Sequence, residues 1–107
     1  MQNKENFLKA IDEKLKIKIT FNSIEKGEIT RTCIPFDFGP SQKDNAIDKS
    51  EKYHVFDLDS PEGKPHNLAV AEDKMIKVET LQESFNPDDY VSWTPSWIYP
   101  RDWGTKS

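Results

Sequence analysis

The sequence predicts a single, mainly β domain: a small barrel of about five antiparallel strands, with a short N-terminal helix and an aromatic-rich C-terminal tail packed on it. Three observations predict this class. The chain has 107 residues, which fits one domain. Several short runs alternate apolar and polar residues, as half-buried antiparallel strands do. Six of the twelve aromatic residues lie between Phe85 and Trp103, in a segment without such alternation.

The helix is expected first along the chain. Asn6 is suited to cap it, because an Asn side chain accepts hydrogen bonds from the first free backbone N–H groups of a helix. Phe7, Leu8, Ala10 and Ile11 then follow at near-helical spacing. The pattern changes to strict alternation near residue 15, so the helix ends before that point.

Five short strands follow, joined mostly by brief turns. Five strands are too few for an immunoglobulin-type sandwich and suit a strongly bent barrel. The chain is therefore expected to be one domain, 1–107, with the barrel at about 6–87 and the Trp-rich tail at 88–107. The expected strands are residues 15–22, 28–36, 52–58, 66–71 and 75–81.

Residues 37–51 predict a long solvated loop and are the strongest candidate for disorder. They include Gly39, Pro40, four acidic residues and two lysines. The tail contains Pro87 at its start and then Pro95 and Pro100, too many prolines for a helix or a central strand. Its aromatic residues therefore either cover the barrel and add to its core or form a docking surface for a partner.

The alternation also predicts the core. We expect Cys33 to be a small core residue rather than a reactive thiol, since no neighbouring feature lowers its pKa. The other expected core residues are apolar positions on the five strands: Ile17, Ile19, Phe21, Ile34, Val55, Phe56, Leu68, Val70, Ile76 and Val78.

The charge distribution limits the kinds of partner. The chain has 15 Lys and Arg against 19 Asp and Glu, a net charge of −4. Tight nonspecific DNA binding needs a clustered positive face, which this balance disfavours. Lys14, Lys16 and Lys18 alternate with apolar residues, a spacing that puts the three amino groups on one strand face. The favoured interpretation is a solvated strand face, because any half-buried antiparallel strand shows this alternation.

Other chemistry finds little support in the residue pattern. His54 and His66, with Asp57 and Asp59 between them, lack the spacing of a metal site. The chain has only four glycines and no Gly-rich phosphate loop or nucleophile elbow. We expect no catalytic residue, no metal and no cofactor. A lone cysteine and the lack of any long apolar run favour the reducing cytoplasm and no membrane span.

Arg31 is the residue that separates a binding function from a structural one. It is the only arginine in the first 100 residues. Its planar guanidinium suits bidentate recognition of a phosphate or carboxylate. The alternative is an ion pair with a carboxylate of the chain itself.

The order of elements resembles the WYL domain, a small barrel related to the Sm and SH3 folds and found in bacterial and phage regulators. The resemblance covers about residues 6–87. Only Tyr53 of the naming triplet is present, and the arginines expected in the fourth strand and before its following Ile are absent, with His66 and Lys74 nearest. The matching positions are Phe21, Arg31, Ile34, Pro35, Phe36, the triplet Lys52, Tyr53 and His54, the run from His66 to Val70, Asp73 with Ile76, and Phe85.

The resemblance implies a non-enzymatic accessory or regulatory module that binds a small anionic ligand, a nucleotide or short single-stranded nucleic acid, in a divergent, stand-alone branch. Small barrels offer a curved sheet on which aromatic residues stack bases and cations hold phosphate. The expected ligand contacts are Arg31, Lys16, Lys18, Tyr53 and His66.

The alternative is a protein-interaction or structural protein of phage or accessory-gene origin. Trp and Tyr dominate the energetics of protein interfaces, so the Trp-rich tail would then be the contact. The sequence leaves the partner and the oligomeric state open. The residues expected at this interface are Trp93, Trp97, Tyr99 and Trp103.

Overall fold

The protein is mainly β, as predicted: a computed structural model has one helix and five strands in a single antiparallel sheet of order β4-β3-β2-β1-β5. It describes residues 2–23, 26–40, 51–59, 66–93, 95 and 97–107. The elements are α1 (Gln2–Glu13), β1 (Leu15–Ser23), β2 (Gly27–Gly39), β3 (Lys52–Asp57), β4 (His66–Ala71) and β5 (Met75–Ser84), with the short 3-10 turns η1 (Glu72–Lys74), η2 (Pro87–Asp89) and η3 (Gly104–Lys106).

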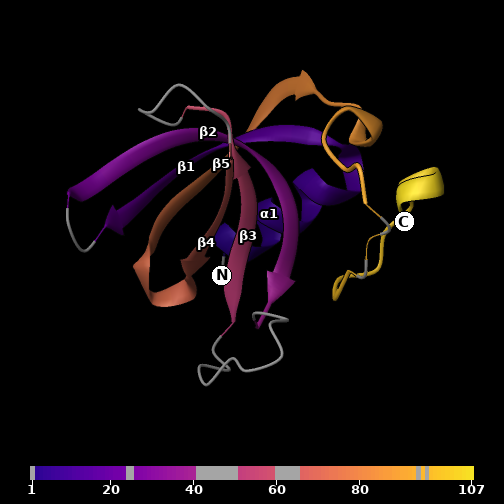
Figure 1. Ribbon diagram of the computed structural model, residues 1–107. Helices are drawn as coiled ribbons and strands as arrows, with labels where there is room; N and C mark the ends of the chain where they lie inside the picture. The colour runs from indigo at the N-terminus through magenta and orange to yellow at the C-terminus, as the bar shows by residue number, and fades with distance from the viewer. Residues whose placement is uncertain (1, 24–25, 41–50, 60–65, 94, 96) are drawn as a thin grey trace.

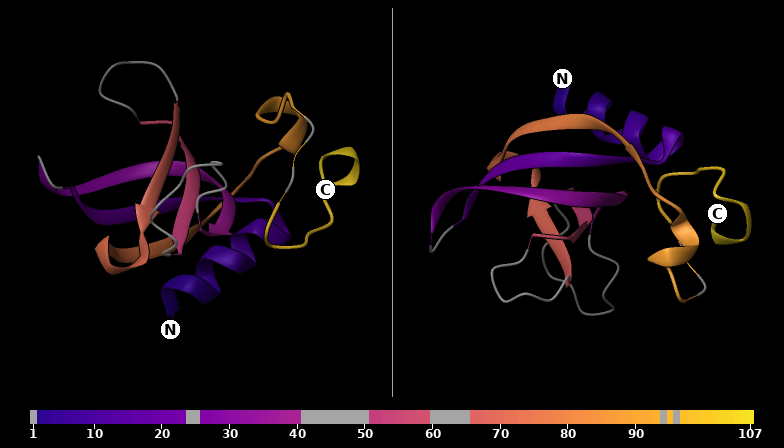
Figure 2. Two further views of the ribbon diagram at one scale, coloured as in Figure 1. Left: turned by 60° about the horizontal axis from the view of Figure 1, so that its bottom comes forward. Right: turned by 90° about the horizontal axis from the view of Figure 1, so that it is seen from above.

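The sheet is strongly bent but not closed into a full barrel (Figure 1). β4 and β5 are its two edges, and no ladder joins them among the described residues. The helix lies against the sheet on the side of β5, and the C-terminal tail packs beside the C-terminal end of that helix (Figure 2). The architecture is therefore barrel-like, with two free edges.

β2 is longer than the alternation predicted. It continues to Gly39, and Asp37, Phe38 and Gly39 are buried. The prediction of a loop at 37–51 is therefore wrong for residues 37–39, while residues 41–50 lie outside the described part. An acidic residue followed by glycine and proline is typical of a loop, but here the Asp37 carboxylate is buried with hydrogen-bond partners. Pro35 is tolerated because β1 pairs with β2 only as far as Cys33 and a bulge follows the proline.

The helix begins earlier than predicted. α1 starts at Gln2, so Asn6 lies inside the helix and is not its N-cap. Instead, Asn6 Nδ2 donates to the carbonyl of Val78 at 3.0 Å. Asn3, one turn earlier, donates to Ile76 O at 3.0 Å and accepts from Val78 N at 3.1 Å. The two Asn side chains thus bond to outward-facing backbone groups of edge strand β5, which protects that edge from pairing elsewhere.

We expect the variant Asn3→Ala to expose this edge locally. The Val78 N–H would lose its acceptor, so its hydrogen exchange should accelerate, and stability should fall by about 1 kcal/mol. Exchange followed by NMR measures the first effect and urea unfolding the second. Lys9→Ala, on the exposed part of the same helix, is the control and should leave Val78 exchange unchanged. Equal protection of Val78 in both variants would contradict the assignment of Asn3 to the edge.

The core follows the prediction with one clear error. Seven of the ten expected residues are buried, and Phe56 and Leu68 pack against the core from partly exposed positions. Ile76 is 45% exposed. The register between β1 and β5 shifts between the pairs Thr20↔Lys77 and Phe21↔Met75. Such an irregularity turns the following residues to the other face, so Met75 takes the buried position beside Phe21.

Candidate functional site

Arg31 is engaged inside the protein. Its Nε lies 3.4 Å from Oδ2 of Asp57, whose side chain is 3% exposed at the end of β3. Asp57 Oδ1 accepts from the N–H of Asp59 at 2.9 Å, and Asp59 Oδ2 accepts from the N–H of Thr32 at 2.8 Å. The guanidinium therefore neutralises a buried carboxylate that also orders the end of β3. This geometry matches the ion-pair interpretation of Arg31.

The two lysines on β1 differ in their environments. Lys16 Nζ lies 2.5 Å from Glu83 Oε2, and this hydrogen bond raises the pKa of Lys16. Lys18 is exposed and stands, by register, between Thr32 of β2 and Glu79 of β5. Lys14 lies in the turn before β1, with φ of 57°. Of the three lysines expected on one strand face, only Lys16 and Lys18 lie on β1. Acidic residues of β5 stand beside both, so the positive charge of this face is partly neutralised.

Tyr53 belongs to the core. Its side chain packs between Phe7 and Phe38, each ring centroid 4.9 Å away, and the residue is 2% exposed. Burial raises the pKa of its hydroxyl, and the charges of Glu72 and Glu51 add to that effect. The Tyr53 ring therefore has no free face on which a nucleotide base could stack. His66 pairs through its backbone with Asp57, but its side chain lies outside the described part.

Cys33 is fully buried, as expected for a core residue. Burial raises the pKa of its thiol, and the nearby carboxylates of Asp57 and Asp59 raise it further, while Arg31 opposes them. The thiol therefore stays protonated at neutral pH, which fits a packing role and not a nucleophilic one.

Most of the tail is built into the fold. Trp103 is 4% exposed, and its Nε1–H donates to Ile11 O of α1 at 2.8 Å. The half-buried Trp97 donates to Lys106 O at 2.7 Å, and the Tyr99 hydroxyl donates to Asp12 Oδ2 at 2.8 Å. These bonds attach the end of the chain to the helix and to itself.

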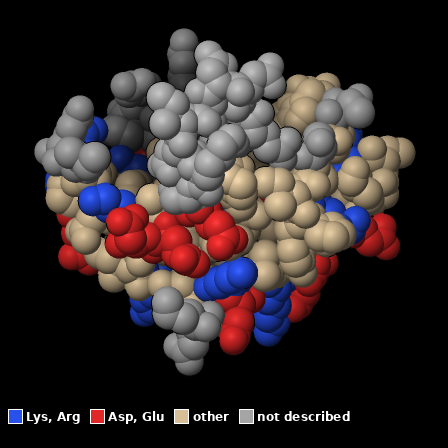
Figure 3. All heavy atoms as spheres, turned by 90° about the horizontal axis from the view of Figure 1, so that it is seen from below, with Lys and Arg blue, Asp and Glu red and all other residues tan. Residues whose placement is uncertain are grey.

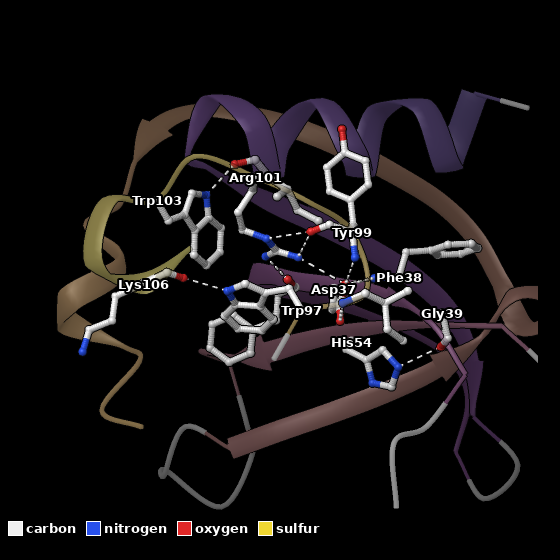
Figure 4. Close-up of polar contacts among 12 residues, drawn as sticks. Asp37, Phe38, Gly39, His54, Trp97, Tyr99, Arg101, Trp103 and Lys106 are labelled. Carbon is white, nitrogen blue, oxygen red and sulfur yellow. Dashed lines mark hydrogen bonds and ion pairs between the residues drawn. The ribbon is translucent and has the colours of Figure 1, made fainter. Parts of the chain in front are cut away.

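A buried ion pair between Asp37 and Arg101 holds the tail on β2 (Figure 4). Asp37 accepts from the backbone N–H groups of Ile98 and Tyr99 at 2.8 and 2.9 Å, and from Arg101 Nη2 at 3.2 Å. Arg101 also donates to the carbonyls of Tyr99 and Phe36. Hence this carboxylate and this guanidinium satisfy one another and the backbone around them.

The Arg101 guanidinium lies between two indole rings (Figure 4). Its central carbon is 4.2 Å from the ring centroid of Trp97 and 4.6 Å from that of Trp103, which allows cation–π attraction to both. Burial lowers the pKa of Arg101 to about 10, and the charge of Asp37 opposes that shift. Arg101 therefore stays charged at neutral pH. We call Asp37, Arg101, Trp97 and Trp103 the tail cluster.

Sequence reasoning missed the tail cluster. Arg101 stands among aromatic residues, a composition that hints at cation–π packing, but no spacing rule connects it with Asp37 across 64 positions. Asp37 carried a weak signal of its own, because it directly follows the apolar strand residues Ile34, Pro35 and Phe36.

An aromatic surface remains beside the tail cluster. Phe36 packs against Phe56, Trp93 and Trp97 with ring centroids 5.7–5.8 Å apart, and Phe56 also contacts Tyr90 at 5.7 Å. We call these five residues the aromatic surface; Phe36 is buried beneath it at 4% exposed, and Phe56, Tyr90 and Trp97 are half-buried. Trp93 is 43% exposed, and Ile98, further along the tail, is also 43% exposed. Of the four tail residues expected at an interface, only Trp93 is exposed; Trp97 and Tyr99 are half-buried and Trp103 is buried.

One face of the molecule carries a concentration of negative charge. Figure 3 shows acidic side chains gathered near the middle of the face seen from below, with lysines and arginines at its margins. Independently of that view, Glu72 and Glu51 are neighbours, since Glu72 N–H donates to Glu51 O at 3.3 Å. Together with Asp73 they lie near the junction of β4 and η1, where a phosphate backbone would be repelled.

The part of the chain that the structure describes contains no cluster of three or more His, Cys, Asp or Glu side chains suited to a metal ion. Nor does any helix within the described residues have the length and apolar character needed to cross a membrane. A scan against models of known protein families finds no match, and a search of curated proteins finds none either. The fold and contacts define a small, mainly β domain whose C-terminal segment is fastened to its sheet.

Proposed function

We propose that this chain is a non-enzymatic protein-interaction module that docks a partner on the aromatic surface. The observation that carries the proposal is Trp93: 43% of this residue is exposed while its ring contacts Phe36 and Trp97. A large apolar side chain that is both exposed and held in place is typical of an interface anchor. Burying the remainder of the indole under a partner would contribute favourable binding free energy.

The tail cluster supports this function by holding the anchor in position. Trp97 stacks on the Arg101 guanidinium, which bonds to Asp37 of β2. Trp93 in turn packs on Trp97 with centroids 6.4 Å apart. A partner therefore meets a preorganised surface and does not have to order the tail when it binds.

Binding of an anionic ligand is the less supported alternative. Among the residues expected to contact such a ligand, Arg31 and Lys16 pair with Asp57 and Glu83, and Tyr53 is buried in the core. Of these contacts, those whose side chains the structure describes leave only Lys18 as an exposed cation. The resemblance to WYL domains is proposed on its sequence pattern, and it is compatible with either kind of partner.

The surroundings of Trp93 indicate the chemistry of the partner. Asp88 and Asp89 are exposed in η2, just before the aromatic surface. The apolar surface with acidic residues at its margin favours a protein segment that has an apolar anchor and basic flanking residues. Charge complementarity of this kind increases the rate and specificity of association.

The experiment compares Trp93→Ala with Ile76→Ala, which removes an equally exposed apolar side chain from β5. Each tagged protein is expressed in the cells of origin, crosslinked and recovered, and its bound proteins are identified and remeasured with purified components. We expect Trp93→Ala to weaken binding by about tenfold or more and Ile76→Ala to have little effect. Equal binding by both variants would reject the proposal. NMR shifts at Arg31 and Lys18 on titration with nucleotides, without shifts at Trp93, would favour the anionic ligand instead.

A further inference from the structure

The two edge strands of the sheet differ in how well they are protected from pairing with another chain. Edge strand β5 has Lys77 and Glu79 in its sequence, has irregular pairing with β1, and is bonded by Asn3 and Asn6 of α1. Figure 2 shows α1 running alongside β5. Charges, bulges and a covering helix are the devices by which proteins prevent strand edges from pairing with other chains.

Edge strand β4 has none of these devices. Its sequence, HNLAVA, has no proline and no Asp, Glu, Lys or Arg. Its register with β3 is unbroken from Lys52↔Ala71 to Asp57↔His66. Among the described residues, none outside the β3 ladder bonds to the backbone of residues 67–71. This edge is regular and uncharged, and it is not covered by the described part of the chain.

The ladder also shows which backbone groups face outward. Glu72 N–H donates to Glu51 O at 3.3 Å, directly beyond the last pair of β3 and β4. Hydrogen-bonded and non-hydrogen-bonded pairs alternate along an antiparallel ladder. Val70 and Leu68 therefore bond to β3, and the intervening residues of β4 direct their N–H and C=O groups away from it. These residues are Asn67, Ala69 and Ala71.

We propose that β4 pairs antiparallel with β4 of a second copy of this chain, forming a two-fold dimer with one continuous sheet. Only outward-facing residues can exchange hydrogen bonds, and a two-fold axis between the two Ala69 residues is the one that pairs all three of them. Ala69 then pairs with Ala69 of the second copy, and Asn67 pairs with Ala71. Each such pair exchanges two backbone hydrogen bonds. An axis through a residue closes the assembly at two copies.

The contacts in this register are compatible with self-pairing. Asn67 and Ala69 are exposed and Ala71 is half-buried, and all three are small enough to stand opposite one another. On the other face, the half-buried Leu68 meets Val70 of the second copy, which adds apolar contact. Glu72 comes level with His66 of the second copy. Within residues 66–72 no two like charges oppose each other in this register, whereas self-pairing of a charged edge would place them together.

Pairing of β4 with β4 is favoured over the other arrangement of identical chains, in which β4 of one copy pairs with β5 of the next. The Ile76 carbonyl and both backbone groups of Val78 already bond to Asn3 and Asn6. A β4 strand would have to displace α1 to reach them. Since α1 also contributes Phe7, Ala10 and Ile11 to the core, that displacement would unfold part of the domain. Head-to-tail chains of many copies are therefore disfavoured.

The test measures the association of the full chain by sedimentation over a wide range of concentration, together with amide hydrogen exchange. We expect a monomer–dimer equilibrium in which protection of the Ala69 amide increases with concentration. The Val70 amide, which bonds to β3, should be protected throughout and serves as the internal control. Ala69→Lys places two like charges at the axis and should raise the dissociation constant by about fivefold or more. Ile76→Lys, a matched change on the other edge, should leave it unchanged.

Three results would overturn the proposal. The first is a wild-type chain that stays monomeric at every concentration with an unprotected Ala69 amide. The second is a dimer that Ile76→Lys disrupts and Ala69→Lys does not. The third is growth into larger assemblies without a limit at two copies. The exchange measurement uses the wild-type chain, so the outcome does not depend on whether the Ala69→Lys variant folds.

Discussion

Replacing Arg101 by methionine is expected to lower the free energy of unfolding by about 3–5 kcal/mol, because it leaves the buried Asp37 carboxylate without its counter-charge. The Arg101 side chain is 0% exposed and that of Asp37 is 7% exposed, so water cannot replace the lost donor. The carbonyls of Phe36 and Tyr99 lose donors as well. Urea unfolding followed by tryptophan fluorescence measures the change.

Two further variants show whether the loss of stability comes from the buried charge and the shape of the guanidinium. Lys9→Met removes a positive charge from an exposed ion pair with Glu13 and should change stability by no more than about 0.5 kcal/mol. Arg101→Lys keeps the charge but loses the planar fork that serves Asp37 and the carbonyls together, so an intermediate loss is expected. A loss below about 1 kcal/mol for Arg101→Met would mean that Asp37 stays satisfied by the backbone N–H groups alone.

Deleting residues 88–107 is expected to have the largest effect of all. The deletion removes Val91 and Trp103 from the core and uncovers Phe36 and Phe85, which pack against Trp97 and Trp103. Each large apolar side chain contributes about 1.5–3 kcal/mol on full burial. The sum is comparable with the whole stability of a small domain. The shortened chain should therefore be largely unfolded at room temperature, as measured by circular dichroism and NMR dispersion.

A shorter deletion is the matched control. Removing residues 105–107 takes away two acceptors. The Lys106 carbonyl accepts from the indole N–H of Trp97, and the Ser107 hydroxyl accepts from the backbone N–H of Trp103. It leaves both indoles in the chain, so the free energy of unfolding should fall by about 2 kcal/mol, at about 1 kcal/mol per lost bond, and the melting temperature by about 10 °C, with the domain still folded at room temperature. If the long deletion melted like the full chain, the tail would be a free interaction segment and its buried contacts would be unimportant for stability.

The site was less predictable than the fold, and particular residues show why. The ion pair of Arg31 was one of two stated alternatives, but only the pairing of β2 with β3 brings Asp57 beside it. Tyr53 was expected to face a ligand, yet the inward position on β3 places it between Phe7 and Phe38. A strand pattern defines two faces but does not show which face meets the core when both carry aromatic residues.

The sequence by itself determined the mainly β class, the one helix and the five strands, because alternation and turn residues act over a few neighbouring positions. The tertiary structure decided three features that depend on residues far apart in the chain. It turned Ile76 outward through the irregular pairing of β1 and β5, and it gave Asn3 and Asn6 their role at the β5 edge. It also buried Asp37 by bringing Arg101 to it. A buried charge is stable only with a partner, and no local pattern reveals a partner 64 residues away.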